Sequence, residues 1–226
     1  MHGYIIDRRA ASRSLRPNSE RLNTDVAESY PDYAIFASYP RFRMQIKDTR
    51  SGYGLLSRLL HWLMAVAIFA LFALGIWMVR LDYYSPYYKL APDIHRSAGI
   101  LLLILLVLRF AWRVTSEKPD DQELKPLERK AAHVVHWGFY PLLLALMISG
   151  YLISTPDGRP IDVFGWFSVP SIIQSKGLED TAGKFHEILA YVTIALATVH
   201  AAAALKHHFV DRSSILTRMW SGPPNT

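Results

Sequence analysis

The stretch that decides the fold is KFHEILAYVTIALATVHAAAALKHHF, from Lys184 to Phe209. It is long and apolar enough to cross the hydrocarbon core of a bilayer as a helix, which takes about 20 residues. Yet it carries His186 and His200. An imidazole inside lipid has to be hydrogen-bonded or bound to something, because an unpaired buried polar group is costly. The segment therefore predicts a membrane helix in which both histidines are either hydrogen-bonded or bound to a ligand.

Three more apolar blocks of spanning length precede it, at about 59–79, 94–112 and 132–153. The first contains no acidic residue, lysine or arginine, and Trp and Tyr gather at block ends, as they do at membrane–water interfaces. Arg96 and Arg109 stand near the two ends of the second block, where long side chains reach the headgroups. With the fourth block at about 185–205, the pattern predicts an all-α transmembrane four-helix bundle of up-down topology. Charged connectors disfavour the alternative of a soluble helical bundle.

The placement of positive charge predicts the orientation. Nineteen of the 25 Lys and Arg residues lie in the N-terminal arm up to Arg58, in the connector 109–130, or from Lys206 onward. Such an excess marks the cytoplasmic side. We therefore expect a multi-pass membrane protein with both termini and the middle connector on the cytoplasmic side. The net charge of +6 is then a topology signal, and a nucleic-acid partner is not expected.

The remainder of the chain adds two limits. There is no cysteine, which excludes thiolate zinc sites, iron–sulfur clusters and covalently attached c-type haem. Residues 1–50 are expected to be a disordered N-terminal extension, with a start at Met44 as an alternative, and 51–220 to be the membrane domain. Within that domain, the run 161–170 is expected to be a loop over the mouth of the bundle.

The histidine spacing predicts two pairs. Fourteen residues of helix turn about 1400° and rise about 21 Å, so His186 and His200 face one interior at two depths. His95 opens the second helix on the non-cytoplasmic side, level with His186. His61 begins the first helix on the cytoplasmic side, level with His200. Each pair thus joins two different helices at one membrane depth.

Facing imidazole pairs in a bundle interior are what a six-coordinate haem iron requires. Zinc would need four ligands around one centre, and a proton relay would need carboxylates, which the helix interiors lack. Gly75 and Gly99 offer places for close approach of a flat macrocycle. His136 begins the third helix and competes with His61 for the cytoplasmic iron, and spacing alone does not choose between them.

At this point the residues resemble a known family, the bacterial four-helix di-haem cytochrome b-561 proteins, over about 50–220. The resemblance is carried by SRLLHW (57–62), IHRSAGILLL (94–103), ISGYLISTPDGRPIDVFGWFSVP (148–170) and FHEILAYVTIALATVHAAAALKHHFVD (185–211). It implies two haem b groups with four axial ligands, and it leaves His136 a structural role. Those ligands fall on His61, His95, His186 and His200.

The resemblance also implies a function. Family members pass electrons across the cytoplasmic membrane and are associated with ubiquinone, and superoxide is one donor that the likeness suggests. The loop STPDGRPIDVFGWFSVP (154–170) is similar to that of a branch of the family often found beside a small periplasmic lipid-binding protein. A periplasmic redox or lipid-binding partner and a homodimer therefore stay open. So does the choice between an electron carrier and a quinone-linked oxidoreductase.

Charged residues near the predicted ligands have two interpretations each. Haem propionates at the membrane edge would pair with basic side chains, and the alternative is ordinary interfacial charge. The candidates are Arg58, Arg96, Lys184 and Lys206. His207 and His208 could serve a quinone at the cytoplasmic mouth. Two rival functions remain: a haem-bearing membrane-anchor subunit that relays electrons for a soluble partner, and a non-redox bundle in which the histidines only bridge helices.

Overall fold

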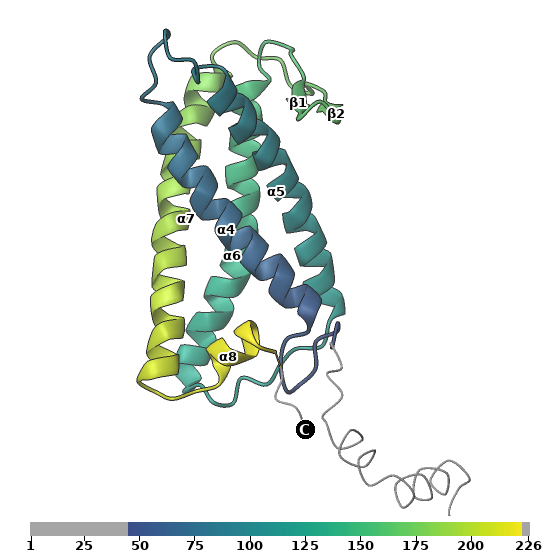
Figure 1. Ribbon diagram of the computed structural model, residues 1–226, viewed down its shortest axis with the longest axis vertical. Helices are drawn as coiled ribbons and strands as arrows, with labels where there is room; N and C mark the ends of the chain where they lie inside the picture. The colour runs from purple at the N-terminus through teal and green to yellow at the C-terminus, as the bar shows by residue number, and fades with distance from the viewer. Residues whose placement is uncertain (1–44, 223–226) are drawn as a thin grey trace, which may run out of the picture. The chain divides into compact units, whose positions relative to one another are not determined.

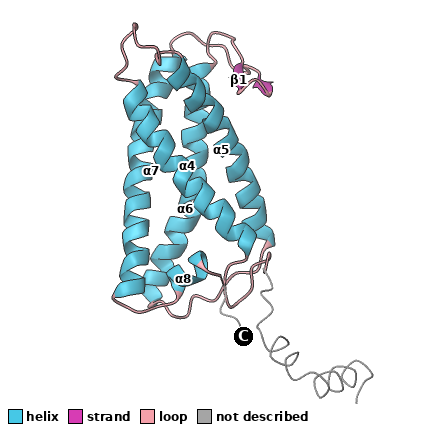
Figure 2. Cartoon of the chain, viewed as in Figure 1, coloured by secondary structure: helices cyan, strands magenta, loops and turns pink. Residues whose placement is uncertain are grey.

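The four predicted membrane helices are present in the structure, a computed structural model that describes residues 45–222 (Figure 1). They run alternately up and down (Figure 2), and each is long and apolar enough to cross a membrane. This confirms the predicted fold class. The expected N-terminal extension lies outside the described residues except for 45–50. The helices are α4 (Leu55–Met78), α5 (Leu90–Thr115), α6 (Pro126–Ser154) and α7 (Leu178–Phe209).

The helices do not all touch one another. Helices that follow each other in the chain pack side by side, α4 on α5, α5 on α6 and α6 on α7. By contrast, α7 touches α4 only sparsely and makes no more than marginal contact with α5. A central apolar layer closes the middle of the bundle, and it consists of Met64, Leu102, Leu106, Leu143 and Leu146.

The outer faces of the helices are apolar, as contact with lipid requires. More than half of each of several large side chains is exposed, among them Leu63, Val66, Val107, Leu108 and Val199. Burial inside the protein cannot account for so much apolar surface, whereas hydrocarbon around it can. The structure thus supports four spanning helices rather than a soluble bundle.

The run 161–170 differs from the expected loop and forms a short hairpin beside α5. Its strands are β1 (Ile161–Val163) and β2 (Phe167–Val169), paired antiparallel. Ile161 and Val163 are buried against Ile100 of α5, with Asp162 between them pointing outward. Three residues of alternation are too few for a strand to be read from sequence. The hairpin is therefore a product of packing on the helix.

Ser97 of α5 holds this hairpin in place. Its hydroxyl donates to the Asp162 carbonyl at 3.0 Å and accepts from the Phe164 amide at 3.3 Å. These contacts satisfy backbone groups next to an apolar helix, where leaving them unpaired is costly. The turn presents Trp166 outward with 73% of its surface exposed. An exposed Trp at this height matches the aromatic belt of a membrane interface.

The opposite end of the bundle, the end expected to face the cytoplasm, has a floor made by a short helix, α8 (Ile215–Trp220). Trp62 donates from Nε1 to the Met219 carbonyl at 3.1 Å. Glu123 of the α5–α6 connector accepts from the Ser214 amide at 2.8 Å and from its hydroxyl at 2.6 Å. These hydrogen bonds hold the pKa of the Glu123 carboxyl below its usual value. Helix α8 thus closes the cytoplasmic end beneath His61.

Candidate functional site

The structure brings His95 of α5 and His186 of α7 together at the non-cytoplasmic end. Their ring centres lie 6.1 Å apart with the ring planes at 76°. The two rings meet across helices that otherwise scarcely touch. His186 is placed by its position one turn into the apolar part of α7, and His95 by the first turns of α5. The pairing predicted from depth is therefore present as a contact.

His61 of α4 and His200 of α7 form the corresponding contact at the cytoplasmic end. Their ring centres lie 6.3 Å apart, within 0.2 Å of the separation in the other pair. A metal–imidazole bond is about 2 Å long and the ring centre lies about 1 Å beyond the nitrogen, so two imidazoles on opposite sides of one metal ion have centres roughly 6 Å apart. Both pairs have the spacing of two axial ligands.

His136 of α6 also lies against His200, with ring centres 5.2 Å apart. The three rings of His61, His136 and His200 therefore share the cytoplasmic end. Helix α6 packs directly on α7, so close approach of their side chains is ordinary there. The contact between His61 and His200 instead spans the sparse α4–α7 boundary, and its longer separation of 6.3 Å is within 0.2 Å of that of the other pair.

Two glycines stand against the histidines of the non-cytoplasmic pair. A Cβ atom added to Gly75 of α4 would lie 3.4 Å from Cε1 of His95. One added to Gly150 of α6 would lie 3.0 Å from Cε1 of His186, closer than side chains normally approach. The expectation that Gly75 sits at this depth is confirmed. Gly99 has no such neighbour, since nothing lies within 4 Å of its Cβ position.

The ring nitrogens have different partners. Nδ1 of His186 lies 3.0 Å from the Leu146 carbonyl and 3.2 Å from the Ser149 hydroxyl. A carbonyl only accepts, so Nδ1 carries the proton and Nε2 keeps a free lone pair, as a metal ligand must. Nδ1 of His95 is buried and has no partner among the described residues. Nδ1 of His61 lies 3.1 Å from Nη2 of Arg109.

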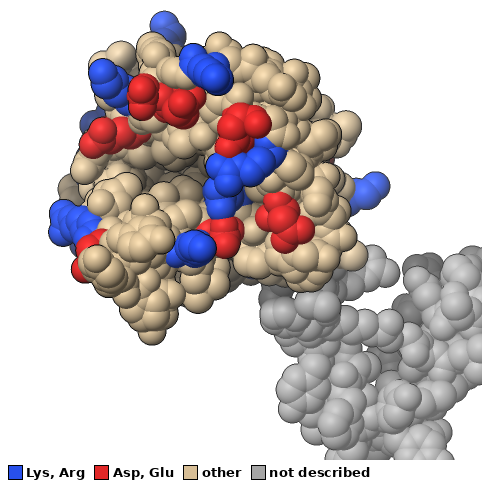
Figure 3. Space-filling model, turned by 90° about the horizontal axis from the view of Figure 1, so that it is seen from above, with Lys and Arg blue, Asp and Glu red and all other residues tan. Residues whose placement is uncertain are grey.

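A cavity of about 1160 Å³ surrounds the non-cytoplasmic pair. His95, Gly75, Gly150 and His186 are part of its wall, and that wall is mostly apolar. It is somewhat larger than typical cofactor pockets of about 300–1,000 Å³. The cavity runs to the non-cytoplasmic end of the bundle, where positive and negative side chains alternate around a central hollow (Figure 3). The charged residues along its wall include Asp157, Arg159, Lys176 and Glu179.

Two of the basic candidates, Arg58 and Arg96, are engaged with protein groups. Arg58 donates from Nη1 to the Trp220 carbonyl at 3.0 Å. Arg96 pairs with Asp93 and also lines the cavity beside His95. Lys184 is exposed. Contacts of Arg58, Arg96 and Lys184 with haem propionates therefore remain predictions. Among the three, Arg96 is the residue that lines the cavity beside His95.

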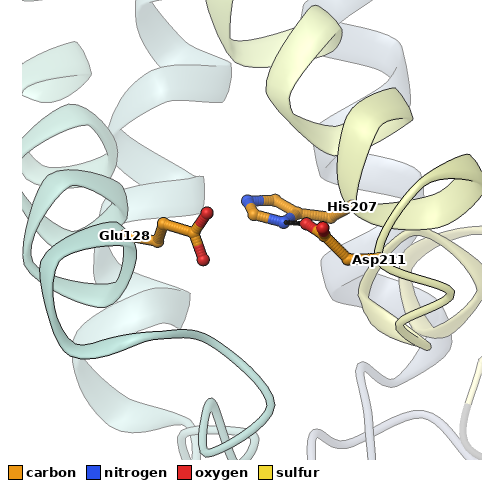
Figure 4. Close-up of side chains that lie close together, drawn as sticks. All are labelled: Glu128, His207 and Asp211. Carbon is orange, nitrogen blue, oxygen red and sulfur yellow. Dashed lines mark hydrogen bonds and ion pairs between the residues drawn. The ribbon is translucent and has the colours of Figure 1, made fainter.

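Lys206 belongs to a group at the cytoplasmic ends of α6 and α7. Its ammonium lies 2.8 Å from Glu128 and 2.7 Å from Asp211, and Nδ1 of His207 lies 2.7 Å from Asp211. Glu128 faces His207 and Asp211 across the helix pair (Figure 4). One potential metal-ligand atom from each of the three residues lies within 4.8 Å of the other two. The hydrogen bond from Lys206 lowers the pKa of the Asp211 carboxyl. Because Lys206 already bridges the two carboxylates, we assign the group a structural role.

Sequence reasoning missed two functional neighbours. It placed Arg109 among the headgroups, whereas the side chain turns inward onto His61. It gave Ser149 no role, although its hydroxyl contacts His186. The signal for Arg109 was a positive charge in the last turns of an apolar helix, level with His61. The signal for Ser149 was a lone hydroxyl beside Gly150.

Known proteins match nearly the whole described region. Residues 52–222 match the family model described as prokaryotic cytochrome b561. "Cytochrome b561 homolog 2" of Escherichia coli K12 is 47% identical over 178 residues, which cover 78% of this chain and 95% of that protein. "Probable superoxide oxidase CybB" of Yersinia pestis is 31% identical over 162 residues, 71% of this chain and 90% of that protein.

Four apolar spanning helices, paired histidines in their interior and these matches agree with one another. The family supports transmembrane electron transfer through b-type haem, and a b-type haem is held non-covalently, as a chain without cysteine requires. The chain therefore belongs to the prokaryotic cytochrome b561 family.

Proposed function

We propose that this protein carries electrons across the bacterial inner membrane through two b-type haems. His95 and His186 would hold one on the non-cytoplasmic side, and His61 and His200 the other on the cytoplasmic side. Electrons would pass between a periplasmic-side donor and the quinone pool. Bound haem supplies a one-electron redox centre, and the protein supplies ligands, burial and orientation.

One observation carries this proposal above the others. Two histidine pairs, each joining helices that barely touch, have ring separations of 6.1 and 6.3 Å. Histidines that merely filled a helix interface would sit where helices pack, and their separations would follow local packing. Equal separations at two sparse boundaries instead match one shared requirement, two nitrogens on opposite sides of a metal.

The residues around the non-cytoplasmic pair fit a flat macrocycle. Gly75 and Gly150 lie against the rings of His95 and His186, where a larger side chain would collide, and the cavity there has a volume of about 1160 Å³. The hydrogen bond from Nδ1 of His186 to the Leu146 carbonyl orients the ring and frees Nε2. These groups bind and orient, and the central apolar layer of the bundle excludes water between the two levels.

The choice of His61 over His136 rests on the same geometry. His61 faces His200 across the sparse boundary, whereas His136 lies beside His200 on a packed helix. His136 would then line the cytoplasmic site without binding the metal. The two levels would be about 21 Å apart along α7, from the 14-residue interval between its histidines.

The proposed functions differ in whether an electron donor has to reach His95 and His186 through the cavity. The cavity opens among Arg159, Lys176 and Glu179, which gives a small donor or a protein partner a route toward His95 and His186. One relative is named a probable superoxide oxidase, which makes superoxide a donor to test here. A membrane-anchor subunit would use the same histidines to relay electrons for a soluble partner, without a substrate site of its own.

The ligand assignment predicts which histidine the cytoplasmic haem needs. His61→Ala is expected to remove about one of two haems per polypeptide, because it deletes an axial ligand. His136→Ala is expected to keep both, since it deletes only a neighbouring ring. Haem would be quantified per polypeptide in membranes solubilised in mild detergent. Loss of haem from His136→Ala with retention in His61→Ala would reverse the assignment.

The glycine contact predicts a selective effect on the other haem. Gly150→Ala puts a methyl group against His186, so the ring has to move. We expect the midpoint potential or the electron paramagnetic resonance signal of one haem to change. Gly138→Ala is the matched control on the same helix, because nothing lies within 4 Å of its Cβ position. Equal spectra for both variants and the unmodified protein would refute the contact.

Proteoliposomes test transmembrane transfer itself. Protein would be reconstituted with a membrane-impermeant oxidant trapped inside and a reductant added outside. The proposal predicts reduction of the trapped oxidant that depends on both His95 and His61. Reduction of haem from outside without transfer to the interior would contradict it. Adding quinone to the same vesicles, with superoxide as the donor, separates a quinone-linked oxidoreductase from a relay.

A further inference from the structure

The cytoplasmic end holds two arginines whose charge is not balanced. Arg109 and Arg113 lie one turn apart on α5, near its cytoplasmic end, and are called the arginine pair below. Residues four apart on a helix present neighbouring side chains. Nη1 of Arg113 is buried and has no hydrogen-bond partner among the described residues. Arg109 contacts Nδ1 of His61 and the side chain of Tyr140, and neither of these partners is a carboxylate.

Nearby carboxylates are committed elsewhere. Glu117 pairs with Arg50, Glu123 with Arg218, and Asp48 accepts from Ser57. Across residues 45–222, the ion pairs found include none with either member of the arginine pair. A buried cation without a counter-ion is costly, so this end of the bundle has a place for an anion.

The contact between Arg109 and His61 also indicates a place for an anion at this end of the bundle. Arginine only donates hydrogen bonds, so Nδ1 of His61 accepts. If a metal bound Nε2, a neutral ring would carry its proton on Nδ1 and could no longer accept. If a metal bound Nδ1, the lone pair would be taken. In either case metal binding by His61 releases Arg109, which then needs a new partner.

We propose that Arg109 and Arg113 form a carboxylate-binding site that holds the propionates of the haem bound between His61 and His200. This rests on the proposed function. A guanidinium matches a carboxylate with two parallel hydrogen bonds, and two of them one turn apart suit a group with two carboxylates. Arg109 contacts His61, and Arg113 follows one turn later on the same side of α5, so both belong to the cytoplasmic end of the interior. Arg58 and Lys206, in contrast, already have protein partners.

The test is a redox titration of purified protein in nanodiscs, with the two haems resolved. Arg109→Gln and Arg113→Gln each remove a positive charge beside one haem. We expect the midpoint potential of that haem to shift negative, because the oxidised and more positive state is favoured, while the other stays. Lys130→Gln removes an exposed charge on the same side and should shift neither.

One further variant keeps the outcome decisive if haem is lost. Should Arg109→Gln lose one haem, Arg109→Lys is expected to restore it with its charge. Failure of that rescue, together with unchanged potentials in Arg113→Gln, would overturn the proposal and leave packing as the cause. Unchanged potentials in both glutamine variants with full haem content would overturn it as well. Absence of any b-type spectrum from the unmodified protein would instead overturn the proposed function.

The anion could come from a phospholipid headgroup, and lipid composition distinguishes the sources. Titrations in nanodiscs of zwitterionic lipid and of lipid with added phosphatidylglycerol should give the same potentials if the carboxylates belong to haem. A potential that follows the anionic lipid content, and loses that dependence in Arg109→Gln, would assign the site to a headgroup phosphate and refute the proposal.

Discussion

Two helices that cross a bilayer with few contacts depend on the side chains that lie between them. Helix α7 packs on α6, whereas it meets α4 and α5 through few contacts, among them the rings of His200 and His186 and the ring pair Phe72–Tyr191. Lipid supplies no hydrophobic force to close such a gap, because hydrocarbon tails are as apolar as the helices. The apolar layer around Leu102 and Leu143 fixes the middle of the bundle. Under the proposed function, a haem bound at each histidine pair would join α7 to the helix opposite.

Much of this could be predicted from sequence because a helix in lipid keeps one regular period over its full length. The interval from His186 to His200 therefore places both rings on one side of α7, and the depths of His61 and His95 select their partners. Contact between the rings in each pair is present in the structure. Helical periodicity could not choose between His61 and His136 as the partner of His200, because that choice depends on which helices pack closely and which do not.

What the sequence could not predict depends on contacts between distant residues. The hairpin at 161–169 consists of two three-residue strands that pack on α5, and α8 has six residues, so neither leaves a periodic signal. The inward turn of Arg109 depends on His61, 48 residues away, and the ion pair of Lys206 on Glu128, 78 residues away. Side-chain direction at helix ends follows such partners rather than local composition.

The two ends of the bundle differ in access and in charge. The non-cytoplasmic end is hollow, with charged residues of both signs around the opening. The cytoplasmic end is closed by α8, through Trp62 and the Glu123–Ser214 contacts, and it concentrates positive charge near His61. Shared family membership fixes the four-helix frame, whereas donors and acceptors are set by features such as these.

The central claim is that both histidine levels bind haem. It is tested most directly by the ratio of haem b to polypeptide in the purified full-length protein, from the pyridine haemochrome spectrum and amino-acid analysis. The account predicts two haems per chain, low-spin and reducible by dithionite. One haem per chain in fully loaded protein would contradict it, and so would a colourless protein.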